Sequence, residues 1–125
     1  MHKNILFGLN SSQLQPQGIE LIREIVDPIQ AYIAGKDELV MVSGFTDDLI
    51  IHDDNLQFQD NWELSSKRAL TVVRELIKHG LIQEDVFGAS FGEGQPVAPN
   101  TSENNRSKNR RVEIAPVPRS SNRKT

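Results

Sequence analysis

The sequence contains no cysteine, which excludes a disulfide framework and a thiolate metal site. Aromatic residues make up only 6% of the chain, and no aromatic platform accompanies the basic run near the C-terminus. The formal net charge is -3, so the chain as a whole has no electrostatic attraction for a phosphate backbone. We therefore expect no nucleic-acid partner.

Long apolar runs are absent as well. No run approaches the roughly 20 residues that a helix needs to cross a bilayer. The first residues, Met1-His2-Lys3-Asn4, lack the apolar stretch of a signal peptide. We expect any membrane anchor to lie outside this sequence. With 125 residues, 37% of them hydrophobic, the chain is long enough for one domain with one core.

Short apolar segments alternate with two stretches of helical periodicity. Isoleucines recur every three to four residues between Pro16 and Gly35, and Pro28 is expected to kink or divide this first helix. A second apolar stripe begins at Asp60, which resembles a helix cap, and ends at Gly80. We also predict strands at residues 4–9, 38–44, 85–91 and 111–115, and a short helix or turn at residues 102–108.

The predicted fold class is α/β. We expect a two-layer sandwich in which a mixed four-stranded sheet carries two long helices on one face, in the order β-α-β-α-β-β. The segment 38–44 is apolar and β-branched, which is typical of a central strand buried on both faces. Residues 48–59 are predicted to form a long loop laid over the body of the domain. We assign residues 1–115 to the domain and expect residues 116–125, which have little to bury, to form a disordered tail.

Polar side chains stand at the ends of these apolar segments. Asp47 follows the predicted central strand, Asn61 begins the second long helix, and Arg68 lies at the margin of its apolar stripe. A carboxylate in a turn can receive an ammonium, and a guanidinium presents a planar fork that matches a carboxylate. These groups suit the paired ammonium and carboxylate of an amino acid. We predict that Asp47 and Arg68 stand close together around an empty, solvent-reachable notch.

Each of these residues also has a simpler interpretation. Asp47 alone is typical of a turn, Arg68 of a solvated helix residue in a surface ion pair, and Asn61 of a helix N-cap. Arg110 and Arg111 are compatible with a solvated basic run. A shared site is favoured because all of them coincide with one family pattern.

That pattern resembles the OmpA-like peptidoglycan-binding domain over roughly residues 4–115. The family pattern runs Gly-His-Thr-Asp, Asn-x-x-Leu-Ser-x-x-Arg-Ala, Gly-Tyr-Gly-Glu-x-x-Pro, Asn-x-Thr and Arg-x-x-Asn-Arg-Arg-Val. The corresponding segments are Gly44-Phe45-Thr46-Asp47, Asn61-Trp62-Glu63-Leu64-Ser65-Ser66-Lys67-Arg68-Ala69, Ser90-Phe91-Gly92-Glu93-Gly94-Gln95-Pro96, Asn100-Thr101-Ser102 and Arg106-Ser107-Lys108-Asn109-Arg110-Arg111-Val112. Phe45 stands where the family usually has His, and Ser90 where it has Gly. Within the family, the Asn-Trp-Glu-Leu-Ser form resembles the flagellar stator subfamily of MotB.

The resemblance implies that Asp47 and Arg68 are the principal contacts to the diaminopimelate of peptidoglycan stem peptides. The full set of implied ligand-binding residues is Asp47, Arg68, Asn61, Leu64, Arg110, Asn10 and Thr46. The implied activity is binding without catalysis, with no cofactor and no metal, which anchors a membrane protein or complex to the cell wall. The resemblance further implies a periplasmic domain, a homodimer, a membrane partner protein and an inner-membrane anchor in a segment absent from this sequence.

Two other functions compete with this one. An envelope or secretion-system interaction module of the same fold, with a weakened or lost peptidoglycan site, is the main alternative. An enzyme is disfavoured, because the adjacent His52, Asp53 and Asp54 point in different directions along a loop and do not form a metal or hydrolytic site.

Overall fold

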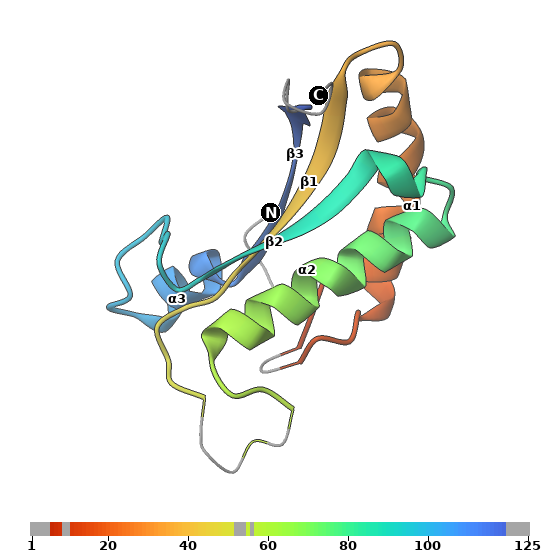
Figure 1. Ribbon diagram of the computed structural model, residues 1–125. Helices are drawn as coiled ribbons and strands as arrows, with labels where there is room; N and C mark the ends of the chain where they lie inside the picture. Colours follow the sequence, from red (N-terminus) through yellow and green to blue (C-terminus); the bar gives the residue numbers. More distant parts are fainter. Residues whose placement is uncertain (1–5, 9–10, 52–54, 56, 120–125) are drawn as a thin grey trace.

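The structure is a computed structural model that describes residues 6–8, 11–51, 55 and 57–119 (Figure 1). Its elements follow one another as helix α1 (Pro16–Ile33), strand β1 (Glu38–Phe45), helix α2 (Asn61–Lys78), the 3-10 turn η1 (Gln83–Asp85), strand β2 (Val86–Gly92), helix α3 (Glu103–Asn109) and strand β3 (Arg111–Pro118). The two long helices and the three later strands lie within a few residues of their predicted positions. Pro28 lies inside α1 without dividing it.

The sheet is mixed, as predicted, with the order β2-β1-β3. β1 runs parallel to β2 and antiparallel to β3, and Figure 1 shows it between them. Its second half is buried throughout, from Val42 to Phe45. The apolar, β-branched sequence of β1 therefore forms the central strand, and its C-terminal end points at the residues that carry the candidate site.

The prediction of four strands is not confirmed, because the sheet has three strands within the described residues. Of the first predicted strand, residues 6–8 are described, and Phe7 makes a single antiparallel bridge with Leu14. Gln15 N donates to Leu6 O at 2.8 Å beside this bridge, and Ser11 N donates to Gly8 O at 3.2 Å in a turn. This part of the segment folds back on itself and does not extend a ladder.

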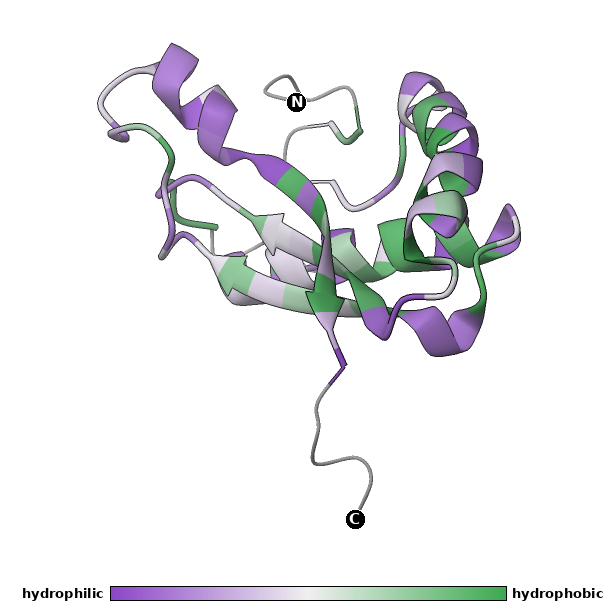
Figure 2. Cartoon of the chain, turned by 90° about the horizontal axis from the view of Figure 1, so that it is seen from above, coloured by the Kyte–Doolittle hydropathy of each residue, from purple (hydrophilic) through white to green (hydrophobic). Residues whose placement is uncertain are grey.

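One hydrophobic core joins both long helices to the sheet. α2 packs against β1 and β2, and α1 packs against α2. The most buried side chains come from all three, namely Ile22 and Val26 of α1, Val40 and Val42 of β1, and Val72 and Leu76 of α2. Figure 2 shows the contrast with α3, whose residues are mostly hydrophilic. α3 is therefore held by polar contacts, which is important for the site.

β3 continues to Pro118, three residues past its predicted end. Pro116 pairs with Val40 and Pro118 with Glu38. Proline is tolerated there because β3 lies at the edge of the described sheet, where one side of the strand needs no ladder donor. Residues 116–118 thus belong to the sheet, although the sequence assigned them to the tail.

Candidate functional site

The first turns of α2 lie directly against the end of β1. A Cβ atom added to Gly44 would stand 2.1 Å from the carbonyl oxygen of Ser65, which is closer than any side chain permits. Gly44 is therefore required for the helix to approach the strand. This close approach brings Asn61, Leu64 and Arg68 of α2 next to the residues that follow β1.

The segment after β1 is a hydrogen-bonded turn. Thr46 N donates to Gly92 O at 2.8 Å, and the Thr46 hydroxyl donates to the carbonyl oxygen of Asp47 at 2.8 Å. Asp47 accepts from the Leu49 amide through Oδ1 at 3.0 Å. Both Thr46 and Asp47 are buried. Asp47 thus has the turn role that its residue type suggests, and it also holds a buried negative charge at the strand end.

The direct partner of this charge is Arg110, the residue that ends α3. Arg110 donates from Nη1 to Asp47 Oδ2 at 2.6 Å, and both side chains are 7% exposed. Its other nitrogen, Nη2, donates to the carboxylate of Glu103, whose side chain is 74% exposed. Burial lowers the pKa of Arg110, but the hydrogen bonds that it donates to Glu103 and Asp47 outweigh burial and raise that pKa. Arg110 therefore lies between an inner and an outer carboxylate and is not part of a solvated basic run.

Arg68 is more deeply buried, with 2% of the residue exposed. Its Nε donates to Ser11 O at 2.9 Å, and its Nη2 donates to Gly8 O at 3.1 Å. No carboxylate in the described part of the chain lies within ion-pair distance of it. Burial and, next, the charge of Arg110 lower the pKa of Arg68 to about 10, with Asp47 opposing the shift. The surface ion pair considered for Arg68 is thus excluded for the described residues.

Among the described residues, Asp47 and Arg68 do not line the open, solvent-reachable notch that was predicted between them. Asp47 is 5% exposed and Arg68 is 2% exposed. The carboxylate is occupied by Arg110 and the Leu49 amide, and the guanidinium by two backbone carbonyls. The sequence placed the two groups in the same neighbourhood but did not identify the partners that fill the space around them.

Asn61 and Leu64 support the turn from α2. The Asn61 amide donates to Leu49 O at 3.1 Å and to Glu93 Oε1 at 3.2 Å. Asn61 is not the N-cap of α2, because Asp60 caps the helix by accepting from the Glu63 amide at 2.9 Å. Leu64 packs with Ile51 and Phe58 and so fixes the described ends of the 48–59 loop, as predicted for that loop.

The two departures from the family pattern have local explanations. Phe45 stacks on Phe91 with ring centroids 4.9 Å apart, and the Arg111 guanidinium lies 3.7 Å from the Phe45 centroid. Ser90 donates to Trp62 O at 3.0 Å and pairs with the Ser65 hydroxyl. Both residues pack the strand ends and the start of α2. The remaining predicted site residue, Asn10, lies outside the described residues.

Two polar residues near the site are not in the predicted ligand-binding set. Asn109 is fully buried and holds the loop before α3, accepting from Val97 N at 2.8 Å and donating to Ala98 O at 2.9 Å. Glu103 begins α3, after the N-cap Ser102. The spacing of seven residues from Glu103 to Arg110 is two helical turns, which places both on one face. That spacing was the signal available for Glu103.

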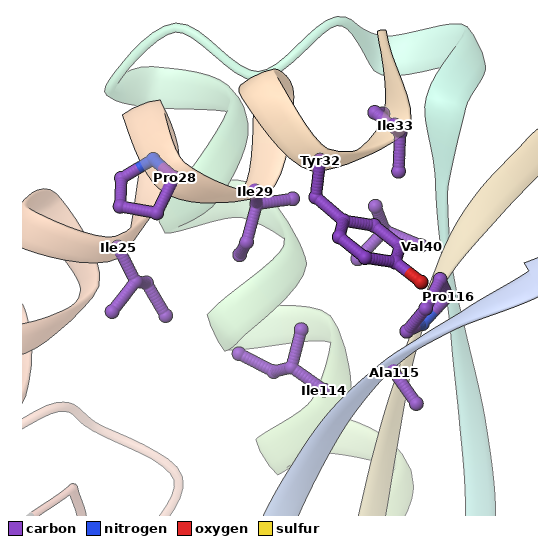
Figure 3. Close-up of a pocket in the computed structure, with 9 residues that line it drawn as sticks. All are labelled: Ile25, Pro28, Ile29, Tyr32, Ile33, Val40, Ile114, Ala115 and Pro116. Atoms are coloured by element: carbon purple, nitrogen blue, oxygen red, sulfur yellow. The ribbon is translucent and has the colours of Figure 1, made fainter. Parts of the chain in front are cut away.

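A second concave surface lies between α1 and the sheet. It is an apolar groove of about 580 Å³, lined by Ile25, Pro28, Ile29, Tyr32 and Ile33 from α1 and by Val40, Ile114, Ala115 and Pro116 from the strands (Figure 3). Figure 3 shows the Tyr32 ring reaching from α1 towards the strands. None of the nine lining residues carries a charge, so this groove has no group that orients a zwitterion.

Neither a metal centre nor a membrane span is found in the described part of the chain. No group of three or more His, Cys, Asp or Glu side chains there is placed to hold an ion. None of its helices is both long and apolar enough to traverse a bilayer. The three residues considered for a hydrolytic site, His52, Asp53 and Asp54, lie outside the described residues.

Comparisons with known proteins place this geometry in context. The sequence model of the OmpA family matches residues 6–110. The chain is 34% identical to Motility protein B of Bacillus subtilis over 117 residues, which is 93% of this chain and 43% of that protein. It is 30% identical to the Peptidoglycan-binding protein ArfA of Mycobacterium tuberculosis over 110 residues, 88% of this chain and 31% of that protein. The chain thus spans less than half the length of these relatives.

A solved structure has a similar fold. The crystal structure of the periplasmic domain of Helicobacter pylori MotB superposes with a TM-score of 0.83 and 31% identity. The match covers 99% of this chain and 75% of that one. The α/β arrangement with a mixed sheet is therefore shared with a periplasmic domain of known structure.

Proposed function

The chain belongs to the OmpA family, and we propose that it binds peptidoglycan without cleaving it and thereby anchors a membrane protein to the cell wall. The ligand that fits the site is the diaminopimelate of the stem peptide, a side chain that ends in one ammonium and one carboxylate. Asp47 would receive the ammonium, and Arg68 and Arg110 would receive the carboxylate. Asn61, Leu64 and Thr46 hold the turn on which Asp47 lies, and Asn10 is proposed as a further polar contact.

The observation that supports this proposal most strongly is the burial of Arg68 on backbone carbonyls. Asp47, Arg68 and Arg110 are each less than a tenth exposed, and Arg110 pairs with Asp47 and Glu103, whereas Arg68 has no carboxylate partner among the described residues. A buried guanidinium without a carboxylate partner is costly, because desolvation is not repaid by an ion pair. The cluster therefore favours one additional carboxylate, which a guanidinium can bind through two parallel hydrogen bonds.

The relatives suggest the biological setting. The name of ArfA says that this relative binds peptidoglycan, and the name Motility protein B says that the relative in Bacillus subtilis acts in motility. We propose that this domain serves a flagellar stator, as a periplasmic homodimer joined to an inner-membrane segment and to a membrane partner protein. These properties are proposed by analogy with relatives of which the chain matches less than half the length.

A second function is favoured by the burial of the cluster. The contacts that fill the space around Asp47 and Arg68 are those of a finished structural network, in which each described polar group has a partner. An envelope interaction module that keeps the fold and has lost its ligand would have such a network. The two functions differ in one measurable property, which is binding to isolated cell wall.

The test combines co-sedimentation with purified peptidoglycan sacculi and titration with a diaminopimelate-containing stem peptide. We expect the protein to bind both, and to bind a stem peptide with lysine in place of diaminopimelate about 10- to 150-fold more weakly. This is the range expected for losing one hydrogen-bonded carboxylate. If the protein binds neither the sacculi nor the diaminopimelate-containing stem peptide, the proposal is rejected in favour of the interaction module. Equal affinity for the two peptides would reject diaminopimelate recognition alone.

Arg68→Lys tests the assignment of the site. Lysine keeps the charge and loses the planar fork, so we expect stem-peptide affinity to fall about tenfold or more. Arg111→Lys is the matched control, because the side chain of Arg111 is also nearly buried, at 8% exposed, but lies on Phe45 and pairs with Glu113. A thermal melt of each variant verifies that it is folded. Unchanged affinity in a folded Arg68→Lys protein would remove Arg68 from the site.

A further inference from the structure

The two carboxylates on Arg110 differ greatly in exposure. Asp47 lies on the inner side of the guanidinium with its side chain 7% exposed, whereas Glu103 lies on the outer side with its side chain 74% exposed. Glu103 comes from α3 itself, two turns before Arg110. The outer half of the Arg110 fork therefore already holds a carboxylate that faces solvent.

From this arrangement, and resting on the proposed function, we infer that Glu103 is an internal competitor that occupies the position of the ligand carboxylate until the ligand displaces it. A free carboxylate and the Glu103 carboxylate can make the same fork bonds to Arg110, so only one of them is held at a time. The binding site is thus closed in the free protein and opens by exchange of one carboxylate for another.

Of the contacts in the cluster, the Glu103–Arg110 ion pair can break at the lowest cost in free energy. Exposed ion pairs contribute little to stability, because water screens them and the side chain loses conformational freedom when it is held. The Asp47–Arg110 pair and the Arg68 hydrogen bonds are buried, and breaking either leaves a buried charge without its partner. An incoming ligand therefore gains access through Glu103, with the inner pair kept intact.

The effect of Glu103 on ligand affinity can be estimated. We take the Glu103–Arg110 pair to stabilise the closed state as weakly as measured surface ion pairs stabilise proteins. Such a pair lowers the apparent affinity of a competing carboxylate by about two- to sixfold. Glu103 also places a negative charge beside the approaching carboxylate, which disfavours ligands that lack an ammonium. The residue therefore reduces affinity and increases selectivity for a zwitterion.

The experiment measures affinity for the diaminopimelate-containing stem peptide by calorimetric titration, with sacculi co-sedimentation as a second readout. Glu103→Gln is expected to bind about two- to sixfold more tightly than wild type. Glu103→Asp keeps the charge and shortens the reach, so its affinity should lie between the two. Glu113→Gln is the matched control, because Glu113 is an exposed carboxylate, with its side chain 51% exposed, that pairs with the neighbouring Arg111. Its affinity should remain that of wild type.

The outcomes separate this inference from the proposed function. Wild-type binding together with unchanged or weakened binding by Glu103→Gln overturns the competitor role and leaves the proposed function standing. An equal gain in Glu103→Gln and Glu113→Gln assigns the effect to net charge and also overturns it. Binding by Glu103→Gln but not by wild type supports the competitor role in a stronger form. If neither protein binds, both the inference and the proposed function are rejected.

Discussion

The two ends of β1 lie in surroundings of opposite polarity. Just past its C-terminal end, Asp47, Arg68 and Arg110 form a buried cluster of charges in which each contact has a specific partner. Near its start, Val40 lies in a groove lined by aliphatic side chains, prolines and one tyrosine. The same strand therefore supports a region held by directional polar bonds and a region held by non-directional apolar burial.

This difference determines what each end can tolerate and what it can recognise. Apolar burial is proportional to area, so a groove side chain can be trimmed at a graded cost. A buried charge depends on its partner, so removing one member leaves the others in an unfavourable state. We therefore expect ligand specificity and sensitivity to single substitutions to be concentrated at the charged end.

The strongest test of this contrast is Asp47→Asn. The substitution keeps the shape of the side chain but removes the buried carboxylate that pairs with Arg110, which leaves the inner side of that guanidinium without its negative partner. We expect the free energy of unfolding, measured by urea denaturation at neutral pH, to fall by about 3–5 kcal/mol. Asp48→Asn is the control, because its ion pair with Arg106 is partly exposed, and it should cost about 0–1 kcal/mol. Similar losses in the two variants would contradict the special status of the cluster.

Gly44→Ala tests whether the charged end also depends on close backbone packing. The added Cβ meets the Ser65 carbonyl oxygen, so α2 must shift away from β1, at a cost of about 1–3 kcal/mol. The shift should also weaken stem-peptide binding, since α2 carries Arg68. At Gly88 of β2 an added Cβ comes no closer than 3.5 Å to a neighbour, so Gly88→Ala should retain stability in the same denaturation assay. A Gly44→Ala protein as stable as wild type would show that the approach of the helix is not required.

Tyr32→Ala, at the rim of the groove, should have the smallest effect. Tyr32 is 53% exposed, and its main contact is the Lys36 ammonium, 3.4 Å from the ring centroid. Loss of an exposed cation–π pair should cost about 0.5–1 kcal/mol. Affinity for the stem peptide should be unchanged in calorimetric titration. A clear loss of affinity would extend the site to the groove and remove the distinction between the two ends.

Much of the local structure followed from the sequence because it depends on neighbouring residues. The apolar run of β1 predicted a central strand, and Asp60 with Glu63 predicted the start of α2, which the Asp60 cap confirms. The family pattern placed Asp47 and Arg110 in one site, and the structure brings them into direct contact. Their roles in ligand binding remain predictions.

The errors concern contacts between distant segments. Nothing near Arg68 in the sequence indicates that it donates to the carbonyls of Gly8 and Ser11, since these partners are supplied by tertiary packing. The first predicted strand was not confirmed: among its described residues, Phe7 forms an isolated bridge with Leu14 and is not paired with the three-stranded sheet. Burial of the cluster, which differs from the predicted open notch, could be seen only in three dimensions.

The hydrogen bonds from Arg68 to Ser11 and Gly8 join positions 57 and 60 residues apart. During synthesis on the ribosome, the N-terminal turn therefore has to wait for more than fifty further residues to emerge before its carbonyls can meet their donor. Closing so long a loop costs conformational entropy that only the docking of α2 can offset. The N-terminal turn thus gains its two bonds to Arg68 only after α2 has been made and has docked.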